Sequence, residues 1–480
     1  MSPRRSIRLA GPLPGVQPRG YRVAAGAGII HFMDSLASFL PFIRAVDAHA
    51  SHRLALAERA QALLAESSQS PDAERLALAD RLERWRYQHW GERFCAWTGE
   101  DQRLADALDL AANRLRGGPA RPPRQSRSAV AAQYDDLAHA EALRWLDQAT
   151  DLERLIALAA DLTDHHFSIT RTDGTTVRRM RLYAPIYLAS DCVNDCPYCG
   201  FGHNLEIPRR WLTIDEVRHE AGILRGRGIR NVLLVAGDFP AHITTGYLSE
   251  IAGSLRDSGM TVAIEIAPQS TASYQSLVAA GVCGLTLYQE TYDEKLYATY
   301  HRRGPKASFP WRLEAPERAA EAGMPRLGLG ILLGLADAAD DLRRLVRHAE
   351  YLRRRFRDRT LAFSLPRIHD APPRFHIPFP VADETFIRLC CVLRIAFPAA
   401  ELVLSTREPA HLRNRLAEIC ITEMSAGSST APGGYSEPAT HGGQQFPIAD
   451  HRPPREVAAW LADRGFSVDF GGGALHSNAH

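Results

Sequence analysis

The sequence predicts an α/β protein whose largest part is a closed (β/α)8 barrel of the TIM type, preceded by an N-terminal helical extension. Two observations lead to this fold class. After residue 178, eight short apolar runs alternate with amphipathic helical segments, which is the pattern of parallel strands joined by crossover helices. Before residue 178, apolar residues recur at helical spacing. A doubly wound open sheet is the alternative architecture, because it shows the same alternation.

Residues 1–33 form the first distinct segment, with five arginines and no acidic residue. Prolines at positions 12, 14 and 18 interrupt any apolar run of the kind that a signal peptide needs. We therefore expect a disordered tail, or an over-extended start with Met33 as the true first residue. Residues 34–116 are expected to form the helical extension, because their leucines and alanines recur at helical spacing.

Residues 117–127 are rich in glycine, proline and arginine, which indicates a linker. Residues 128–177 predict a helical lead-in, most clearly over Leu137–Thr163, and residues 471–480 a tail. The barrel is expected over residues 178–470. Its predicted strands are Arg181–Leu188, Asn231–Ala236, Thr261–Ala267, Gly284–Gln289, Arg326–Leu333, Thr360–Leu365, Glu401–Ser405 and Ile419–Met424. The predicted helices between them include Ile214–Arg225, Tyr247–Ser258, Trp311–Ala322, Ala339–Arg354 and Asp383–Phe397.

Polar residues follow the predicted strands, where the chemistry of such barrels lies. We expect Glu265, Glu290, Arg367 and Arg407 to converge on one mouth. Helix capping is the simpler explanation for a residue such as Asp238 taken alone. It explains the four charged residues poorly.

Three cysteines follow the first predicted strand at the spacing C-x3-C-x2-C: Cys192, Cys196 and Cys199. Thiolates at this spacing can hold one [4Fe-4S] cluster and leave one iron open for a substrate or cofactor. A zinc site completed by His203, or purely structural cysteines, are the alternatives. The other five cysteines are expected to be buried apolar thiols rather than a disulfide framework.

The cysteine motif, with an aromatic residue (Tyr198) before its last cysteine, resembles the signature of the radical S-adenosylmethionine (SAM) enzymes. The longer segment 182–201 resembles a narrower group, the radical SAM aromatic amino-acid lyases. Further segments with this resemblance are 287–292, 301–306, 311–314, 402–408 and 424–428. Residues 431–435, with Gln445, Phe446 and Asp450, are most similar to the 2-iminoacetate synthases, the tyrosine lyases of thiamine biosynthesis. We find no resemblance in residues 1–150.

The resemblance implies two cofactors, a [4Fe-4S] cluster on the three cysteines and SAM. It also implies roles for single residues. The expected SAM contacts are Tyr198, Asp238, Glu265, Glu290 and Arg312. The expected substrate contacts are Tyr187, Arg407 and Ser425, with Arg407 on the substrate carboxylate. Two positions depart from the family pattern, since Asp238 stands where glutamate is usual and His369 where the thiamine enzymes tend to have arginine.

The function implied is cleavage of the Cα–Cβ bond of tyrosine to 2-iminoacetate (dehydroglycine) and p-cresol through a 5′-deoxyadenosyl radical, for thiamine thiazole synthesis. A tryptophan lyase, or another radical SAM enzyme acting on an aromatic amino acid, is the nearest alternative. A non-catalytic iron–sulfur electron carrier or scaffold, and a methyltransferase or sulfur-inserting enzyme, come from other classes. No cysteine follows Cys420, which argues against the second cluster of the hydrogenase maturase.

Charge and hydropathy limit the classes of partner that the chain is expected to bind. The chain has 57 basic and 55 acidic residues and a net charge of +2, so neither nucleic acid nor an anionic membrane is expected as a partner. Its most apolar long stretch, residues 26–45, is interrupted by charged residues and is not expected to span a membrane. Free thiols predict a reducing, cytoplasmic setting. The resemblance implies a one-electron reductant such as flavodoxin or ferredoxin, and a thiazole synthase as a further partner.

Overall fold

The structure is a computed structural model that describes parts of residues 72–84 and 109–117, residues 124–131 and 137–373, and residues 375–437 and 443–471. The tail expected over residues 1–33 lies outside these described residues. Most of the extension expected over residues 34–116, and residues 472–480, also lie outside them.

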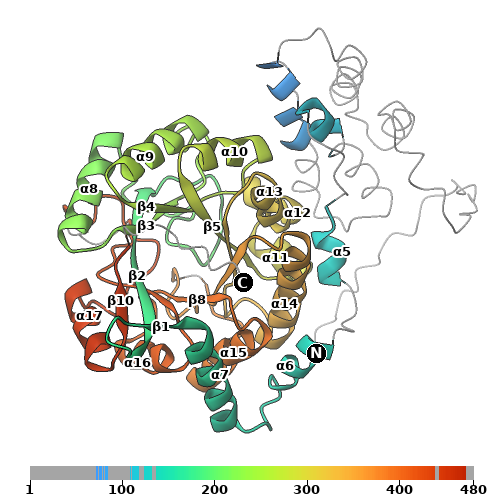
Figure 1. Ribbon diagram of the computed structural model, residues 1–480. Coiled ribbons are helices and arrows are strands. Elements are labelled where there is room, and N and C mark those ends of the chain that lie inside the picture. Colours follow the sequence, from blue (N-terminus) through green and yellow to red (C-terminus); the bar gives the residue numbers. More distant parts are fainter. Residues whose placement is uncertain are drawn as a thin grey trace, which may run out of the picture.

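Eight parallel strands form a closed barrel, as the sequence predicts (Figure 1). The open-sheet alternative is wrong, because the last strand pairs back with the first and aligns Arg181 with Glu423. The barrel strands are β2 (Thr176–Ala189), β3 (Asn231–Ala236), β4 (Thr261–Glu265), β5 (Val282–Glu290), β6 (Arg326–Ile331), β7 (Thr360–Ser364), β8 (Glu401–Leu404) and β9 (Glu423–Ser425).

The eighth strand begins later than predicted. The apolar run that starts at Ile419 forms the end of a helix and a buried turn, and β9 begins only at Glu423. Periodicity does not separate a buried helix end from a buried strand. Two short strands were not predicted: β1 (Ser168–Thr170) pairs antiparallel with β2, and β10 (Ser467–Asp469) pairs parallel with it.

Helices surround the barrel (Figure 1). They are α5 (Ser126–Ala131), α6 (Leu137–Arg144), α7 (Leu152–Phe167), α8 (Ile214–Gly226), α9 (Thr245–Asp257), α10 (Thr271–Ala279), α11 (Glu294–Tyr300), α12 (Phe309–Leu313), α13 (Ala315–Glu321), α14 (Ala338–Arg355), α15 (Asp383–Ala396), α16 (Ala410–Ile419) and α17 (Pro454–Asp463), with a 3-10 turn η3 (Pro305–Ala307). The predicted helix over Trp311–Ala322 is two helices, because Pro316 cannot donate a backbone hydrogen bond and starts a new helix.

Several helices are preceded by a residue whose side chain accepts a hydrogen bond from a backbone N–H in the first turn. Thr213 and Glu216 form a complete capping box at α8, and Ser270 caps α10. Asp293 and Asp337 cap α11 and α14 in the same way. These local signals explain why α8 and α14 start close to where the sequence predicts them.

A cluster of buried charges lies at the floor of the barrel, at the amino-terminal ends of the strands. Arg326 of β6 donates to Glu401 at 2.5 Å and to Glu423 at 2.9 Å. Arg181 of β2 donates to Glu401 at 2.9 Å. We call Arg181, Arg326, Glu401 and Glu423 the floor cluster. It joins four strands across the barrel interior and lies at the end that contributes stability rather than catalysis.

Helix α5 packs on the outside of the barrel against α14 and α12 (Figure 1). The last residues of the linker expected over 117–127 do not form a linker. Arg124 is buried among acidic side chains, and α5 begins at Ser126. Within the part of the chain that the structure describes, no helix is both long enough and apolar enough to cross a membrane.

Candidate active site

A cavity of about 850 Å³, counted to its open mouth, lies at the carboxyl-terminal ends of the strands. Seven of the predicted site residues line it: Tyr187, Tyr198, Cys199, Glu265, Glu290, Arg407 and Ser425. The other four, Cys192, Cys196, Asp238 and Arg312, lie around it and contact the loops and side chains that form its wall. The barrel therefore brings residues from β2, β4, β5, β8 and β9 to one site.

The three motif cysteines lie on the loop after β2, and all three are free thiols. The Arg209 guanidinium fixes this loop by donating to four carbonyl oxygens, those of Ser190 (2.6 Å), Phe201 (2.8 Å), Gly202 (2.7 Å) and Leu205 (3.0 Å). One side chain thus joins both ends of the cysteine loop. Sequence reasoning missed Arg209, because the bonds that it makes are to main chain and leave no motif.

The thiols suit a cluster better than a single zinc ion. Burial raises the pKa of Cys192, Cys196 and Cys199, and Lys306 opposes this rise at each of them. A bound iron would favour the thiolate form in such a place. His203, the fourth ligand in the zinc interpretation, instead places its Nδ1 3.2 Å from the Cys192 carbonyl oxygen. Among the described residues, no three His, Cys, Asp or Glu side chains lie close enough to bind one metal ion.

Asn194, inside the cysteine motif, ties the loop to two other parts of the barrel. Its Nδ2 donates to Asp238 Oδ2 at 3.0 Å, and its Oδ1 accepts from the Lys306 backbone N–H at 3.1 Å. A Cβ at Gly304 would collide with Asn194 Oδ1, so the close approach requires glycine. Burial raises the pKa of Asp238, and the bond from Asn194 opposes this rise. Asp238 caps no described helix and faces the cysteine loop.

Glu290 ends β5 in a left-handed backbone conformation, with φ of +71°. Such a conformation costs about 1–2 kcal/mol for a residue other than glycine and is kept where the surroundings hold it. Lys306 Nζ donates to Glu290 Oε1 at 2.6 Å, and Arg312 Nη2 donates to the same oxygen at 3.0 Å. Arg312 also donates from Nε to the Tyr288 carbonyl oxygen at 2.6 Å. Burial would raise the pKa of Glu290, but the two cations outweigh it, so the pKa is lowered.

Arg407 is a partly buried guanidinium that faces the cavity, and its side chain lies over the Phe446 ring at 3.4 Å. Among the described residues, no carboxylate forms an ion pair with it. The nearby carboxylates are engaged elsewhere, because Glu408 pairs with Arg367 and His369 and Glu401 belongs to the floor cluster. Burial lowers the pKa of Arg407, whereas Tyr187 and Glu265 oppose this change.

Arg367 does not reach the cavity, contrary to the expectation that it joins Glu265, Glu290 and Arg407 at the mouth. Its guanidinium pairs with Glu408 and, at 2.8 Å, with Asp383 at the start of α15. The neighbouring residues Pro366 and Ile368 line the cavity instead. Arg367 therefore fixes the loop after β7, and two carboxylates from other elements draw it away from the mouth.

Glu265 and Tyr187 lie on the same wall as Arg407. Burial, and then the charge of Glu290, raises the pKa of Glu265 to about 7. The Tyr187 hydroxyl donates to Gln445 Oε1 at 2.6 Å, which brings a residue 258 positions later into the site. Ser425 of β9 lies beside Tyr183 of β2 in the register of the closing strands.

Several lining residues carried no predicted role, among them Tyr183, Tyr288, Lys306 and Gln445. Tyr183 and Tyr288 alternate with core residues along β2 and β5, so only the closed barrel shows that they point inward. Lys306 follows Gly304-Pro305 in a loop that packs on Asn194. The glycine–proline pair directly before this lysine was the feature of the sequence that could have identified it.

Two family models match the chain. Residues 186–349 match the Radical SAM superfamily, and residues 364–467 match the Biotin and Thiamin Synthesis associated domain. The chain is 34% identical over 316 residues to the 2-iminoacetate synthase of Escherichia coli, covering 65% of this chain and 81% of that enzyme. The enzyme of the same name from Salmonella typhimurium is 32% identical over 385 residues, covering 80% of this chain and 94% of that enzyme.

The chain belongs to the radical SAM aromatic amino-acid lyase group. It is a radical SAM lyase that uses a [4Fe-4S] cluster and SAM, and such an enzyme requires a reductant as well as a substrate. The Salmonella match is longer than the part of the chain after residue 150, so the resemblance extends into the first 150 residues, where we expected none. This correction makes part of the helical extension a shared feature.

Solved structures agree with this family. The FeFe-hydrogenase maturase HydG from Carboxydothermus hydrogenoformans superposes with a TM-score of 0.63 at 29% identity, covering 84% of this chain and 86% of that chain. Methylornithine synthase superposes with a TM-score of 0.55 at 21% identity, covering 72% of this chain and 97% of that chain, and shows the fold alone.

Proposed function

We propose that this radical SAM lyase cleaves the Cα–Cβ bond of tyrosine to 2-iminoacetate and p-cresol. The observation that carries the proposal is Arg407, a partly buried guanidinium that faces the cavity and is not in an ion pair with any described carboxylate. A free amino acid brings a carboxylate into a site that must exclude water, and a guanidinium can bind it through two parallel hydrogen bonds. The two relatives named 2-iminoacetate synthase support tyrosine as that amino acid.

Cys192, Cys196 and Cys199 would hold the cluster. When bound, the cluster and SAM supply a carbon radical that removes a hydrogen atom from the substrate. The chain's own residues bind and shield the reactants. Tyr187 is held by Gln445 beside the substrate position, and Ser425 lies on the neighbouring strand. The aromatic side chains of the cavity exclude water from a radical that would react with almost any C–H bond.

The SAM contacts of this proposal surround the cysteine loop. Asp238, placed by Asn194, would bind the SAM amino group. Glu290 and Arg312, joined at 3.0 Å, would bind its ribose and carboxylate. The backbone of Tyr198, whose hydroxyl lies 2.8 Å from His301 Nε2, would meet the adenine. Glu265 lines the same cavity, and its charge interacts with those of both Glu290 and Arg407.

We further propose that the product serves thiamine thiazole synthesis, with a flavodoxin or ferredoxin as the electron donor and a thiazole synthase as the acceptor of 2-iminoacetate. The match of residues 364–467 to the Biotin and Thiamin Synthesis associated domain supports this placement. The cytoplasm, where reduced carriers keep thiols free, is the proposed location.

The test is anaerobic incubation of the reconstituted enzyme with dithionite, SAM and one amino acid at a time, followed by product identification. Tyrosine should give 5′-deoxyadenosine, p-cresol and glyoxylate, the hydrolysis product of 2-iminoacetate. Turnover of tryptophan but not tyrosine would keep the lyase group and overturn the substrate. Formation of 5′-deoxyadenosine with neither amino acid consumed would overturn the proposed reaction, and iron binding without SAM cleavage would favour the electron carrier.

A further inference from the structure

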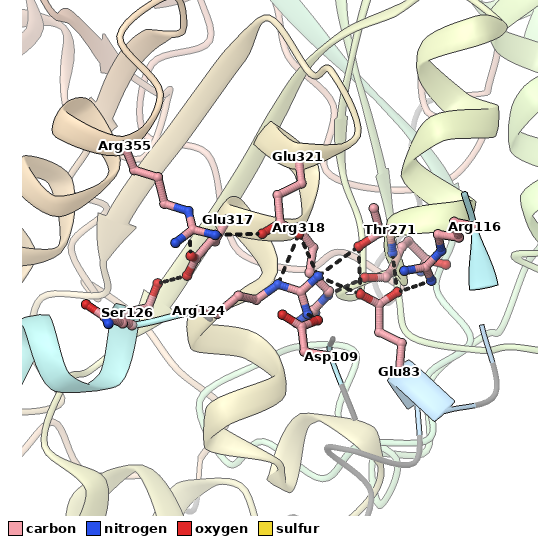
Figure 2. Close-up of polar contacts among 12 residues, drawn as sticks. Glu83, Asp109, Arg116, Arg124, Ser126, Thr271, Glu317, Arg318, Glu321 and Arg355 are labelled. Atoms are coloured by element: carbon pink, nitrogen blue, oxygen red, sulfur yellow. Dashed lines mark hydrogen bonds and ion pairs between the residues drawn. The ribbon is translucent and has the colours of Figure 1, made fainter. Parts of the chain in front are cut away.

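We propose that the N-terminal extension, together with α5 and the segment leading into it, positions the Glu290–Arg312 pair, and so sets the affinity of the enzyme for SAM. The proposal rests on the proposed function in that Glu290 and Arg312 contact SAM. Glu83, Arg124 and Ser126 form what we call the brace. Figure 2 shows the brace against the side chains of α10 and α13. Two chains of polar and electrostatic interactions lead from it to the pair.

The first chain starts at Glu83, which packs against the outside of the barrel and whose side chain is fully buried there. Its carboxylate accepts from the Thr271 backbone N–H at 2.7 Å and from the Thr271 hydroxyl at 2.6 Å, at the start of α10. Arg124 and Arg116 pair with it at 2.7 and 2.9 Å. Burial alone would raise the pKa of Glu83, but Arg124, Arg116 and Arg318 outweigh it and hold the pKa well below its usual range.

Arg318 carries this chain from Glu83 to the site. It is fully buried on α13, donates from Nε to the Gln269 carbonyl oxygen at 2.8 Å, and donates from Nη2 to the Trp311 carbonyl oxygen at 2.7 Å. Its guanidinium also stacks over the Trp311 ring at 3.7 Å. Trp311 directly precedes Arg312 on α12. The link between Glu83 and Arg318 is electrostatic, because the Arg318 charge acts on the Glu83 carboxylate, and Arg318 in turn binds the backbone beside Arg312.

The second chain starts at Ser126, the first residue of α5. Its hydroxyl donates to Glu317 Oε2 at 2.8 Å and lies 3.2 Å from His348 Nε2. The hydroxyl uses its one proton in the hydrogen bond to Glu317. It can therefore only accept from His348, so His348 Nε2 is the donor. Burial lowers the pKa of His348 to about 3, so the ring is neutral and its Nδ1 accepts from the Tyr292 hydroxyl at 2.9 Å. Tyr292 lies two residues after Glu290.

Both chains end beside the same ion pair. One fixes α12 next to Arg312, and the other fixes the segment that follows Glu290. Glu290 has a left-handed backbone, which only a rigid neighbourhood can maintain. Arg124 couples the chains. It precedes Ser126 by two residues, and it pairs with Glu83 and, at 2.6 Å, with Glu321 on α13 (Figure 2). The extension is thus part of the SAM-binding wall.

Equilibrium binding of SAM to the full-length, reconstituted enzyme without amino acid tests the proposal. Glu83→Gln keeps the shape and removes the charge, and Ser126→Ala breaks the second chain. Each variant should raise the dissociation constant and the KM for SAM by about five- to twentyfold. The iron content per chain and the KM for tyrosine should stay at wild-type values, and Glu83→Asp should restore part of the affinity. Glu294→Gln is the matched control, because it removes the partly exposed pair between α5 and α11.

The outcomes separate the two proposals. A lower melting temperature with unchanged SAM affinity in both Glu83→Gln and Ser126→Ala would make the brace purely structural and overturn the proposal. Glu290→Gln, measured alongside, must itself weaken SAM binding, and otherwise the SAM contact fails and the brace proposal with it. If SAM affinity changes as expected but tyrosine is not consumed, the brace stands and the substrate assignment fails. Should Glu83→Gln not fold, Ser126→Ala decides the question.

Discussion

Arg407 differs from the buried arginines. They bind carboxylates or main-chain carbonyls, whereas Arg407 is partly buried and faces the cavity over an aromatic ring. Arg407→Lys keeps the charge but loses the two-pronged donor. We expect the KM for the amino acid to rise and kcat/KM to fall by about 30- to 1000-fold, which corresponds to about 2–4 kcal/mol.

Arg388→Lys is the control for this substitution, since Arg388 is buried and donates to the Trp145 carbonyl oxygen and to Thr150. It should lower the melting temperature and leave the KM unchanged. Steady-state kinetics with SAM saturating would place Arg407 outside the substrate site if Arg407→Lys behaved like Arg388→Lys.

Asp238 faces Asn194 at 3.0 Å, so it has two available roles, binding SAM and fixing the cysteine loop. Asp238→Asn removes the charge-assisted bond to the SAM amino group, and we expect the KM for SAM to rise about tenfold or more. Asp238→Glu, which has the usual family side chain, should be tolerated. An Asp238→Asn enzyme with normal SAM affinity but less bound iron would show that the loop contact is the one that matters.

Glu265 has a pKa raised to about 7 by burial and by the charge of Glu290. Below this pH it is neutral, and above it the carboxylate competes with the substrate carboxylate for Arg407. We therefore expect the KM for the amino acid to rise as pH increases through 7, and Glu265→Gln to remove this rise. A pH profile of KM between 6 and 8.5 measures the effect, and an identical rise in the variant would contradict it.

The same shift has a consequence for stability. The folded protein keeps a proton on Glu265 that the unfolded chain releases at its ordinary pKa, so this residue costs stability as pH rises from that value to about 7. Glu265→Gln should therefore melt at a higher temperature than wild type at pH 8. The difference should shrink at pH 5, which gives the kinetic experiment an independent control.

The cysteine loop is the element on which cofactor binding depends, and Arg209 holds it through four carbonyl oxygens. Arg209→Lys can satisfy only part of this set, because an ammonium lacks the flat fork of a guanidinium. We expect the variant to lose a large part of its iron during anaerobic gel filtration and to show a broadened EPR signal. Iron content per chain is the direct measurement.

Arg218→Lys gives the comparison at element scale. Arg218 lies exposed on α8 and pairs with Asp215 one turn away, at 2.8 Å. Such surface pairs contribute under about 1 kcal/mol. Iron retention should match wild type in Arg218→Lys, and equal retention in Arg209→Lys would show that the loop keeps its shape without the guanidinium.

At the scale of the whole molecule, the floor cluster separates stability from chemistry. Arg326 joins β6 to Glu401 of β8 and Glu423 of β9, at the amino-terminal ends of the strands, whereas the cavity lies at their carboxyl-terminal ends. Arg326→Met leaves two buried carboxylates without their main partner, which should destabilise the protein by about 3–5 kcal/mol. Chemical denaturation should show this loss, whereas kcat and both KM values below the melting range should stay unchanged. A changed KM would mean that the floor and the mouth are coupled.

The barrel could be predicted from the sequence because strand and crossover helix each have their own period and their own start signal. Thr213 with Glu216 before α8 is such a signal. The cysteine motif could also be recognised from the sequence, because its three cysteines lie within eight residues of one another. The start of β9 could not, since the apolar run that begins at Ile419 belongs to a helix end and a turn, whereas β9 itself is Glu-Met-Ser.

The rest of the site depends on contacts that no local pattern records. Gln445 reaches Tyr187 across 258 positions, and Arg367 turns away from the mouth because Asp383 and Glu408 come from other elements. Arg407 was placed correctly because it ends a strand whose neighbours were also recognised. Closure of the barrel brings these residues together, so the site is a property of the whole chain.

The contact between the cysteine loop and the segment near residue 445 sets an order of events during synthesis. The Gly200 N–H donates to the Gln445 carbonyl oxygen at 3.0 Å, so the loop is closed by a segment made long after it. At about 5–20 residues per second, roughly 12–50 s separate the emergence of Cys199 and Gln445 from the ribosome. During that interval the three thiols are open to cluster delivery, and equally open to oxidation.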